Sequence, residues 1–241
     1  MNYIVLASRL ALAGGILTAL LIGGAGPLYK YAGLSLQSAL PLMFYGTIAA
    51  GATLLLSVIW LGIAAVTRSG AGLVLVVVGS VLAVGAAMVP VSMRSQAQRV
   101  PMIHDITTDT ANPPAFVAIA ALRAEAPNGV DYATDPAEQL KAYVDITTYQ
   151  SALSPGELFD KALAAAQAQG WEIVASSREE GRIEATDTTL WFGFKDDVVI
   201  RIVVGEAGGS KLDIRSMSRV GKSDLGKNAD RIRAFLAALP K

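Results

Sequence analysis

One histidine stands beside an acid in this sequence, at His104-Asp105. An aspartate can orient an imidazole so that it takes a proton from a serine or from water, as hydrolases require. The sequence has no Gly-x-Ser-x-Gly motif, so its many Ser and Thr residues offer no preferred nucleophile. His104 and Asp105 are therefore weak catalytic candidates, and a membrane-tethered hydrolase that uses them is our alternative hypothesis.

A second candidate site lies in the block Asp213–Asp224, where basic residues precede a predicted helix. A glycine turn before a helix N-terminus can hold a small anion or carboxylate, because backbone N–H groups point toward it. The candidate binding residues are Arg215, Arg219, Lys222 and Ser223. In a structural interpretation, which also stays open, the turn and its acids serve the fold through Asp197, Asp213, Gly221 and Asp224. We expect the structural role for Arg215 and leave Arg219 open.

Composition removes several other kinds of site. The chain has no cysteine and one histidine, whereas structural zinc needs four nitrogen or sulfur ligands and catalytic zinc usually three protein ligands. Lys and Arg total 20, as do Asp and Glu, which argues against the concentrated basic surface of a nucleic-acid-binding protein. We predict no metal site, no cofactor and no nucleic-acid partner.

The acids are confined to one part of the chain. Residues 1–100 contain no Asp or Glu, so all 20 acids lie in the remainder. A bilayer core of about 30 Å needs roughly 20 apolar helical residues. Three uncharged stretches reach that length, and they are Leu10–Tyr29, a stretch within about Ala39–Thr67, and Ser69–Met93. We predict three membrane-spanning helices over residues 1–93, with the lipid bilayer as their partner.

Small residues within these stretches indicate how the helices pack. They recur at four-residue spacing, which lets helix backbones approach closely in a membrane. The pairs are Ala11/Gly15, Gly46/Ala50 and Gly79/Ala83. The stretches contain no acid and no histidine, whereas transport and proton-relay paths normally carry ionisable residues. The pattern predicts a compact bundle and argues against a transporter.

Charge alone leaves the membrane orientation undetermined. The positive-inside rule counts Lys and Arg in short loops. With the N-terminus inside, the cytoplasmic charges are the amino group, Arg9 and Arg68; with it outside, they are Lys30, Arg94 and Arg99. The count is a tie.

The rest of the chain has the size of one compact domain. We assign 94–100 to a juxtamembrane linker and 101–241 to a soluble domain. Its first part, 101–151, is rich in Pro, Asn, Asp and Thr and is interpreted as an extended lead-in around a core at 152–241. Short helices are predicted in the lead-in at Ala115–Arg123 and Pro136–Tyr143.

The core shows the clearest local signals. Ser154 followed by Pro155 and Glu157 predicts a capped helix over Pro155–Gln169. Four strands follow at Trp171–Ser177, Gly181–Thr188, from about Asp197, and at Lys211–Arg219. A final amphipathic helix is capped by Ser223 or Asp224. Tight turns make the strands antiparallel, so we predict an α+β two-layer sandwich (helix, four antiparallel strands, helix), with both helices on one sheet face.

The opposite sheet face carries mixed charge. Alternation along the strands places on it Asp213, Arg215, Met217, Arg219, Arg182, Glu184 and Arg201. Such a face is usually solvated. Two other possibilities stay open: it binds an acidic partner, or the lead-in covers it and gives Asp105 and Asp109 their counter-charges.

Several sequence blocks resemble domain-of-unknown-function family 1499 over about Pro101–Leu239. The most specific block runs from Asp213 to Asn228 and continues to Arg231-Ile232. The other blocks are Gly170–Ile173, Phe194–Val198, Ile103–Asp109 and Tyr143–Ile146. The resemblance assigns no chemistry, and this chain lacks the cysteines that some members carry near the domain start.

Many members of that family lie outside the cytoplasm, and this resemblance breaks the tie in orientation. It implies a multi-pass protein of the bacterial inner (plasma) membrane with a periplasmic domain. We interpret the chain as a membrane-anchored extracytoplasmic binding or interaction module rather than an enzyme. Besides the bilayer, its expected partner is another envelope protein or a small anionic ligand.

Overall fold

The computed structural model describes residues 3–205 and 208–240. The chain forms two compact units, and each is described by itself below. The first unit is mainly helical, and the second contains a β-sheet. The units comprise Met1–Ser95 with Leu190–Gly193, and Gln96–Thr189 with Phe194–Lys241.

The first unit is built on α1 (Tyr3–Ala32), α2 (Leu36–Thr67) and α3 (Leu73–Ala97). Within the described residues, these three helices are long and apolar enough to cross a membrane. This confirms the three predicted stretches. Helix α3 ends at Ala97, so the segment predicted as a linker begins inside a helix.

Small residues from two of the spaced pairs, Ala11/Gly15 and Gly79/Ala83, bring α1 and α3 together. A Cβ added to Gly15 would collide with the backbone of Gly79, and one added to Gly79 would collide with the Ala11 carbonyl. Between α2 and α3, the Ser80 hydroxyl donates a hydrogen bond to Ser57 Oγ at 2.8 Å. Close backbone contact and hydroxyl groups therefore join these helices in place of charged residues.

The second unit contains a sheet that is antiparallel throughout. Over residues 96–205 and 208–240 it has six strands in the order β1-β6-β5-β4-β3, and β2 also pairs with β6. The strands are β1 (Asp105–Thr107), β2 (Tyr149–Ser151), β3 (Glu172–Ser177), β4 (Arg182–Thr188), β5 (Lys195–Val204) and β6 (Ser210–Ser218). Four match the prediction. The lead-in supplies β1 and β2, which are three residues each and too short to show alternation.

Four helices complete this unit within its described residues: α4 (Ala118–Leu122), α5 (Pro136–Ala142), α6 (Pro155–Ala168) and α7 (Lys227–Ala237). At α6 the predicted capping box is present: the Glu157 carboxylate accepts the Ser154 N–H at 3.0 Å, and Ser154 Oγ accepts the Glu157 N–H. Gly170 follows with a φ of 78°, as its predicted place after the helix requires.

The start of α7 differs from the prediction. Its N-cap is Gly226, with a φ of 83°, rather than Ser223 or Asp224. Leu225 also has a positive φ, so the chain turns twice before the helix can begin. Asp224 still serves the helix, because its carboxylate accepts the N–H groups of Gly226 and Asn228, both at 2.8 Å.

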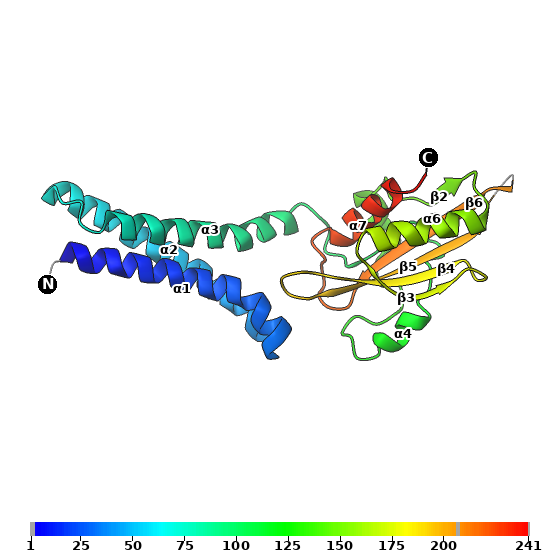
Figure 1. Ribbon diagram of the computed structural model, residues 1–241, viewed down its shortest axis with the longest axis horizontal. Helices are drawn as coiled ribbons and strands as arrows, with labels where there is room; N and C mark the ends of the chain where they lie inside the picture. The colour runs from blue at the N-terminus through cyan, green and yellow to red at the C-terminus, as the bar shows by residue number, and fades with distance from the viewer. Residues whose placement is uncertain (1–2, 206–207, 241) are drawn as a thin grey trace. The chain divides into compact units, whose positions relative to one another are not determined.

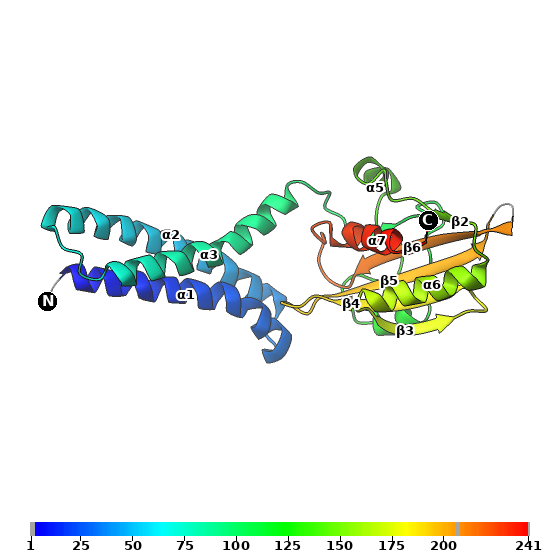
Figure 2. The same cartoon turned by 45° about the horizontal axis from the view of Figure 1, so that its top comes forward.

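The two sheet faces are covered differently, and Figure 1 and Figure 2 show α6 and α7 together on one of them. We call this the inner face; its apolar core includes Val198, Ile200 and Ile202 of β5. The other is the outer face, where Val199 packs against Ile119 of α4. The predicted helical anchor and α+β sandwich are confirmed, and the lead-in adds a partial third layer.

Candidate functional site

A buried ion pair joins the lead-in to the outer face. Arg215 Nε donates to Asp105 Oδ1, and its Nη2 donates to Oδ2, both at 2.9 Å. The two side chains are 3% and 0% exposed. The Arg215 guanidinium lies over the rings of Phe116 and Tyr132, with centroids 4.9 and 5.6 Å away. Arg215, a predicted binding residue, is therefore closed to solvent.

Asp197 lies at the centre of a second buried group. Its Oδ2 accepts Arg123 Nη1 at 2.7 Å and Arg219 Nε at 2.8 Å, while Oδ1 accepts the Thr186 hydroxyl at 2.7 Å. Burial raises the pKa of Asp197, but the hydrogen bonds from Arg219, Thr186 and Arg123 outweigh it and hold the pKa below its ordinary value. The Arg219 side chain stays 15% exposed, so it is the more accessible of the two predicted arginines.

Arg123 was missed by the sequence analysis. Its side chain is fully buried, and burial lowers its pKa despite the contact with Asp197. Arg123 also donates to the backbone oxygens of Gly129 and Met217, at 2.8 and 3.1 Å. Its only sequence signal was its place at the end of a short predicted helix in an otherwise polar segment.

Glu184 fastens α4 to the sheet. Its carboxylate accepts the N–H groups of Val117, Ala118 and Ile119 at 3.1, 3.0 and 2.8 Å. These are first-turn amides that would otherwise lack a partner, and a negative charge is favourable there. Glu184 is fully buried, so an acid of β4 replaces the cap that α4 does not carry itself.

A third pairing involves Arg201 of β5. Its Nη2 donates to Asp109 Oδ2 at 3.0 Å and to Asp213 Oδ2 at 2.9 Å. The hydroxyls of Thr108 and Thr148 donate to Asp213 Oδ1 at 3.0 and 2.6 Å. The lead-in thus covers much of the outer face, which is one of the three possibilities left open by the sequence.

The turn after β6 contains Gly221, and the helix cap expected at Ser223 or Asp224 lies at Gly226 instead. Gly221 has a φ of 93°, and its carbonyl accepts Asn128 Nδ2 at 2.9 Å. Ser223 Oγ accepts the Leu225 N–H at 3.3 Å. Lys222 lies exposed beside them.

His104 and Asp105 do not form an orienting pair. Within the described residues, the Asp105 carboxylate accepts hydrogen bonds from Arg215 and Ala133. The hydrogen bonds described for His104 are made by its backbone, whose carbonyl accepts Asn228 Nδ2. The His104 carbonyl accepts Ser218 N–H at 3.0 Å. Neighbouring side chains on an extended chain point to opposite faces, which separates these two.

A polar cluster under α7 was also missed. Arg231 Nη2 donates to Asp196 and Asp187 at 2.6 and 2.8 Å, and its Nη1 donates to Ser216 Oγ at 3.0 Å. Burial lowers the pKa of Arg231, but Asp196 and Asp187 outweigh it and raise the pKa. Arg231 lies next to the apolar Ile232 in the helix. Its partners lie on strands far away in the chain, so helical periodicity gave no sign of them.

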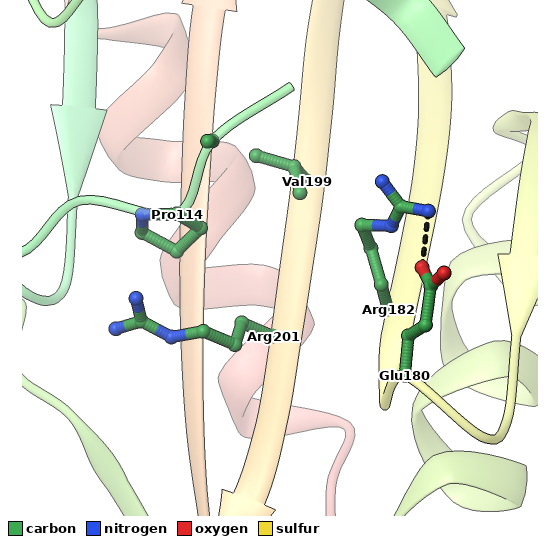
Figure 3. Close-up of a pocket in the computed structure, with 6 residues that line it drawn as sticks. Pro114, Glu180, Arg182, Val199 and Arg201 are labelled. Atoms are coloured by element: carbon green, nitrogen blue, oxygen red, sulfur yellow. Dashed lines mark hydrogen bonds and ion pairs between the residues drawn. The ribbon is translucent and has the colours of Figure 1, made fainter. Parts of the chain in front are cut away.

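A pocket of about 220 Å³ opens on the outer face, and Figure 3 shows the residues that line it. Its floor and walls mix apolar and charged groups. The lining residues are Pro114, Ala115, Glu180, Arg182, Val199 and Arg201. Arg182 and Arg201 are register partners on β4 and β5, and Arg182 forms an ion pair with Glu180. The sequence placed both arginines on this face, but the hollow depends on Pro114 and Ala115, whose position it could not give.

A protein-family model matches residues 105–239, and its description is "Protein of unknown function (DUF1499)". The chain belongs to the DUF1499 family. This confirms the resemblance seen in the sequence. The DUF1499 region runs from β1 to the end of α7, so it contains the buried ion pairs and the pocket. No match was found among curated proteins.

Proposed function

We propose that this DUF1499 protein is a membrane-anchored binding module whose sheet domain lies outside the cytoplasm. The observation that carries the proposal is the outer-face pocket, where apolar side chains lie next to a partly exposed guanidinium. Apolar walls with a few oriented polar groups are typical of small-molecule sites. The Arg182 side chain is 19% exposed and can therefore meet a ligand.

The chemistry of the pocket favours binding over catalysis. None of its six lining residues is Ser, Cys, His or Lys, and its one carboxylate, that of Glu180, is paired with Arg182. The hydrolase alternative depends on an imidazole oriented by Asp105. That carboxylate is already held by both Nε and Nη2 of Arg215.

For the Asp213–Asp224 block, where the sequence left a binding and a structural role open, we propose a mainly structural role. Arg215 and Arg219 both pair with buried acids, and Gly221 supplies the turn. A small anion at this turn would meet one exposed ammonium, that of Lys222, and part of the Arg219 guanidinium.

The proposed location is the bacterial inner membrane with a periplasmic domain. The acid-free first 100 residues support insertion into a membrane. The periplasmic orientation is supported by the resemblance to family members that lie outside the cytoplasm. A reporter that is active only outside the cytoplasm, fused after Lys241, should be active. Activity only from a cytoplasmic reporter at the same position would reverse the orientation.

Binding itself is tested on the full chain in a non-ionic detergent. A panel of small acids, amines and neutral molecules is screened by thermal shift, since a ligand that binds only the folded state raises the melting temperature. Ala115→Leu places a larger side chain at the pocket wall and should abolish the shift, whereas Ala111→Leu, at an exposed lead-in position, should preserve it. If no class of compound stabilises the wild type, the binding proposal fails.

A further inference from the structure

We infer that the outer-face pocket binds a carboxylate attached to a small apolar group, and that this carboxylate replaces Glu180 on Arg182. The inference rests on the proposed function and names the ligand class of the same pocket. Three observations support it. Arg182 is paired with an exposed acid that a ligand can replace, the pocket is partly lined by apolar side chains, and the second arginine, Arg201, is paired with two other acids.

Glu180 is the exchangeable partner of Arg182. Its side chain is 59% exposed on the turn between β3 and β4, and exposed ion pairs contribute little stability. The other acid beside Arg182 is Glu184, 3.2 Å from Nη1. Glu184 is buried and holds the first amides of α4, so a ligand cannot displace it without releasing that helix. An incoming carboxylate therefore competes with Glu180 alone.

Arg201 forms a wall of the pocket. Figure 3 shows its guanidinium directed away from Arg182, on the far side of Val199. Within the described residues, its Nη2 is shared by Asp109 and Asp213. The pocket thus offers one replaceable charge contact, which suits a monocarboxylate.

The charges near the pocket also disfavour a phosphate. Among the described residues, Arg182 and Arg201 form ion pairs with four acids: Glu180, Glu184, Asp109 and Asp213. A doubly charged anion would be repelled by the acids that remain after Glu180 swings out. A single carboxylate replaces one negative charge with another and leaves the local balance unchanged.

The rest of the ligand must be small and apolar. Val199 is buried in the outer face, and Pro114 and Ala115 line the pocket with it. The volume of about 220 Å³ is below the roughly 300–1,000 Å³ of pockets for drug-sized molecules. A free aromatic or branched acid fits these limits, and so does the C-terminal residue of a peptide, because both present a carboxylate beside an apolar group.

The test uses the full chain in non-ionic detergent and measures dissociation constants by calorimetry. The probes are benzoate, its neutral analogue benzamide, the peptide acetyl-Val-Leu with a free C-terminus, and the same peptide as an amide. At least one of the two acids should bind, and neither amide should bind. Tighter binding of benzoate indicates a free small acid, and tighter binding of the peptide acid indicates a chain end.

Two substitutions test the competition. Glu180→Gln should tighten binding of the acid by up to about fivefold, because it removes an exposed competitor. Arg182→Gln should weaken it by about tenfold or more, because it removes a charged hydrogen-bond donor. The matched controls are Glu179→Gln in the same turn and Arg178→Gln, whose exposed side chain pairs with Asp160 outside the pocket. Neither control should change the affinity.

Ala115→Leu provides a variant that keeps every charge and should also abolish binding. The inference is overturned if neither acid binds wild type or Glu180→Gln, or if binding ignores both Glu180→Gln and Arg182→Gln. If neither acid binds, a neutral or basic compound whose thermal shift disappears in Ala115→Leu would leave the proposed binding function standing, and absence of any such compound removes both. If an acid binds but ignores both substitutions, loss of its binding in Ala115→Leu would leave the proposed binding function standing without the exchange at Arg182.

Discussion

The inner and outer faces of the sheet are stabilised in different ways, and neighbouring residues of β6 show the contrast. Ile214 is fully buried in the apolar core beneath α6 and α7. Arg215 is buried on the other face, where it needs one particular acid, Asp105. Apolar contact is non-directional, whereas a buried charge is costly unless its partner is correctly placed. We therefore expect the outer face to fix where the lead-in lies and the inner face to supply most of the stability.

The largest expected effect comes from breaking the buried pair. Arg215→Ala should lower the free energy of unfolding by about 3–5 kcal/mol, because it leaves Asp105 buried without its counter-charge. Chemical denaturation of the full chain in detergent measures this. Arg178→Ala, which breaks an exposed pair with Asp160, should have little effect.

A double substitution sharpens the same point. Changing both partners, with Asp105→Leu and Arg215→Met, should recover much of the stability lost in Arg215→Ala, because no unpaired charge remains. If Arg215→Ala melts like the wild type, the pair is not structural. Loss of binding of a carboxylate or phosphate in that variant would then restore Arg215 as a binding residue.

The matched test on the inner face is Ile214→Ala. It should cost about 2–5 kcal/mol through lost contact and the cavity left behind. The cost should be the same at pH 5 and pH 8, since no titratable group is removed. A marked pH dependence of this difference would show that the two faces are coupled.

A smaller effect is expected at Glu184. Glu184→Gln should destabilise the domain by about 1–3 kcal/mol. Two carboxylate oxygens accept the N–H groups of α4 in the wild type, whereas an amide has only one acceptor oxygen. Hydrogen exchange should show faster exchange at Val117–Ile119 before any loss in the strands. Glu179→Gln, at an exposed position, should leave these amides protected.

The last prediction concerns how Asp197 makes the stability of the domain depend on pH. This dependence is absent at neutral pH and appears only in acid. Its folded-state pKa lies below the ordinary value. The unfolded chain therefore binds a proton first as pH falls below about 3.9. The stability from Asp197 is fully present above that pH and is lost as pH falls through the folded-state pKa. Denaturation midpoints across this range should fall less steeply for Asp197→Asn than for wild type; parallel curves would contradict the assignment.

Elements with a strong local pattern could be predicted from the sequence. The membrane stretches have the length and charge pattern that insertion demands, and α6 has its own capping residues, Ser154 and Glu157. Alternation also placed the charges on the correct sheet face. These features depend on residues close together in the chain.

Features made by distant residues could not be predicted. The lead-in has little periodicity, so β1, β2 and the place of Arg123 depend on strands formed much later in the chain. The pocket is of the same kind, since Pro114 and Ala115 reach it from the lead-in. At α7, two successive residues with positive φ, Leu225 and Gly226, moved the helix start past the expected cap.

The pairing of β1 with β6 has a consequence for how the protein is made. Asp105 and Arg215 are separated by 110 residues, so the first strand leaves the ribosome long before its partner. At about 5–20 residues per second, the delay is roughly 5–20 seconds. During this time the early segment must stay in water without aggregating. Its charged and hydroxyl side chains, including Asp105 and Thr107, are soluble in water, and they become buried only when the last strand pairs with this segment.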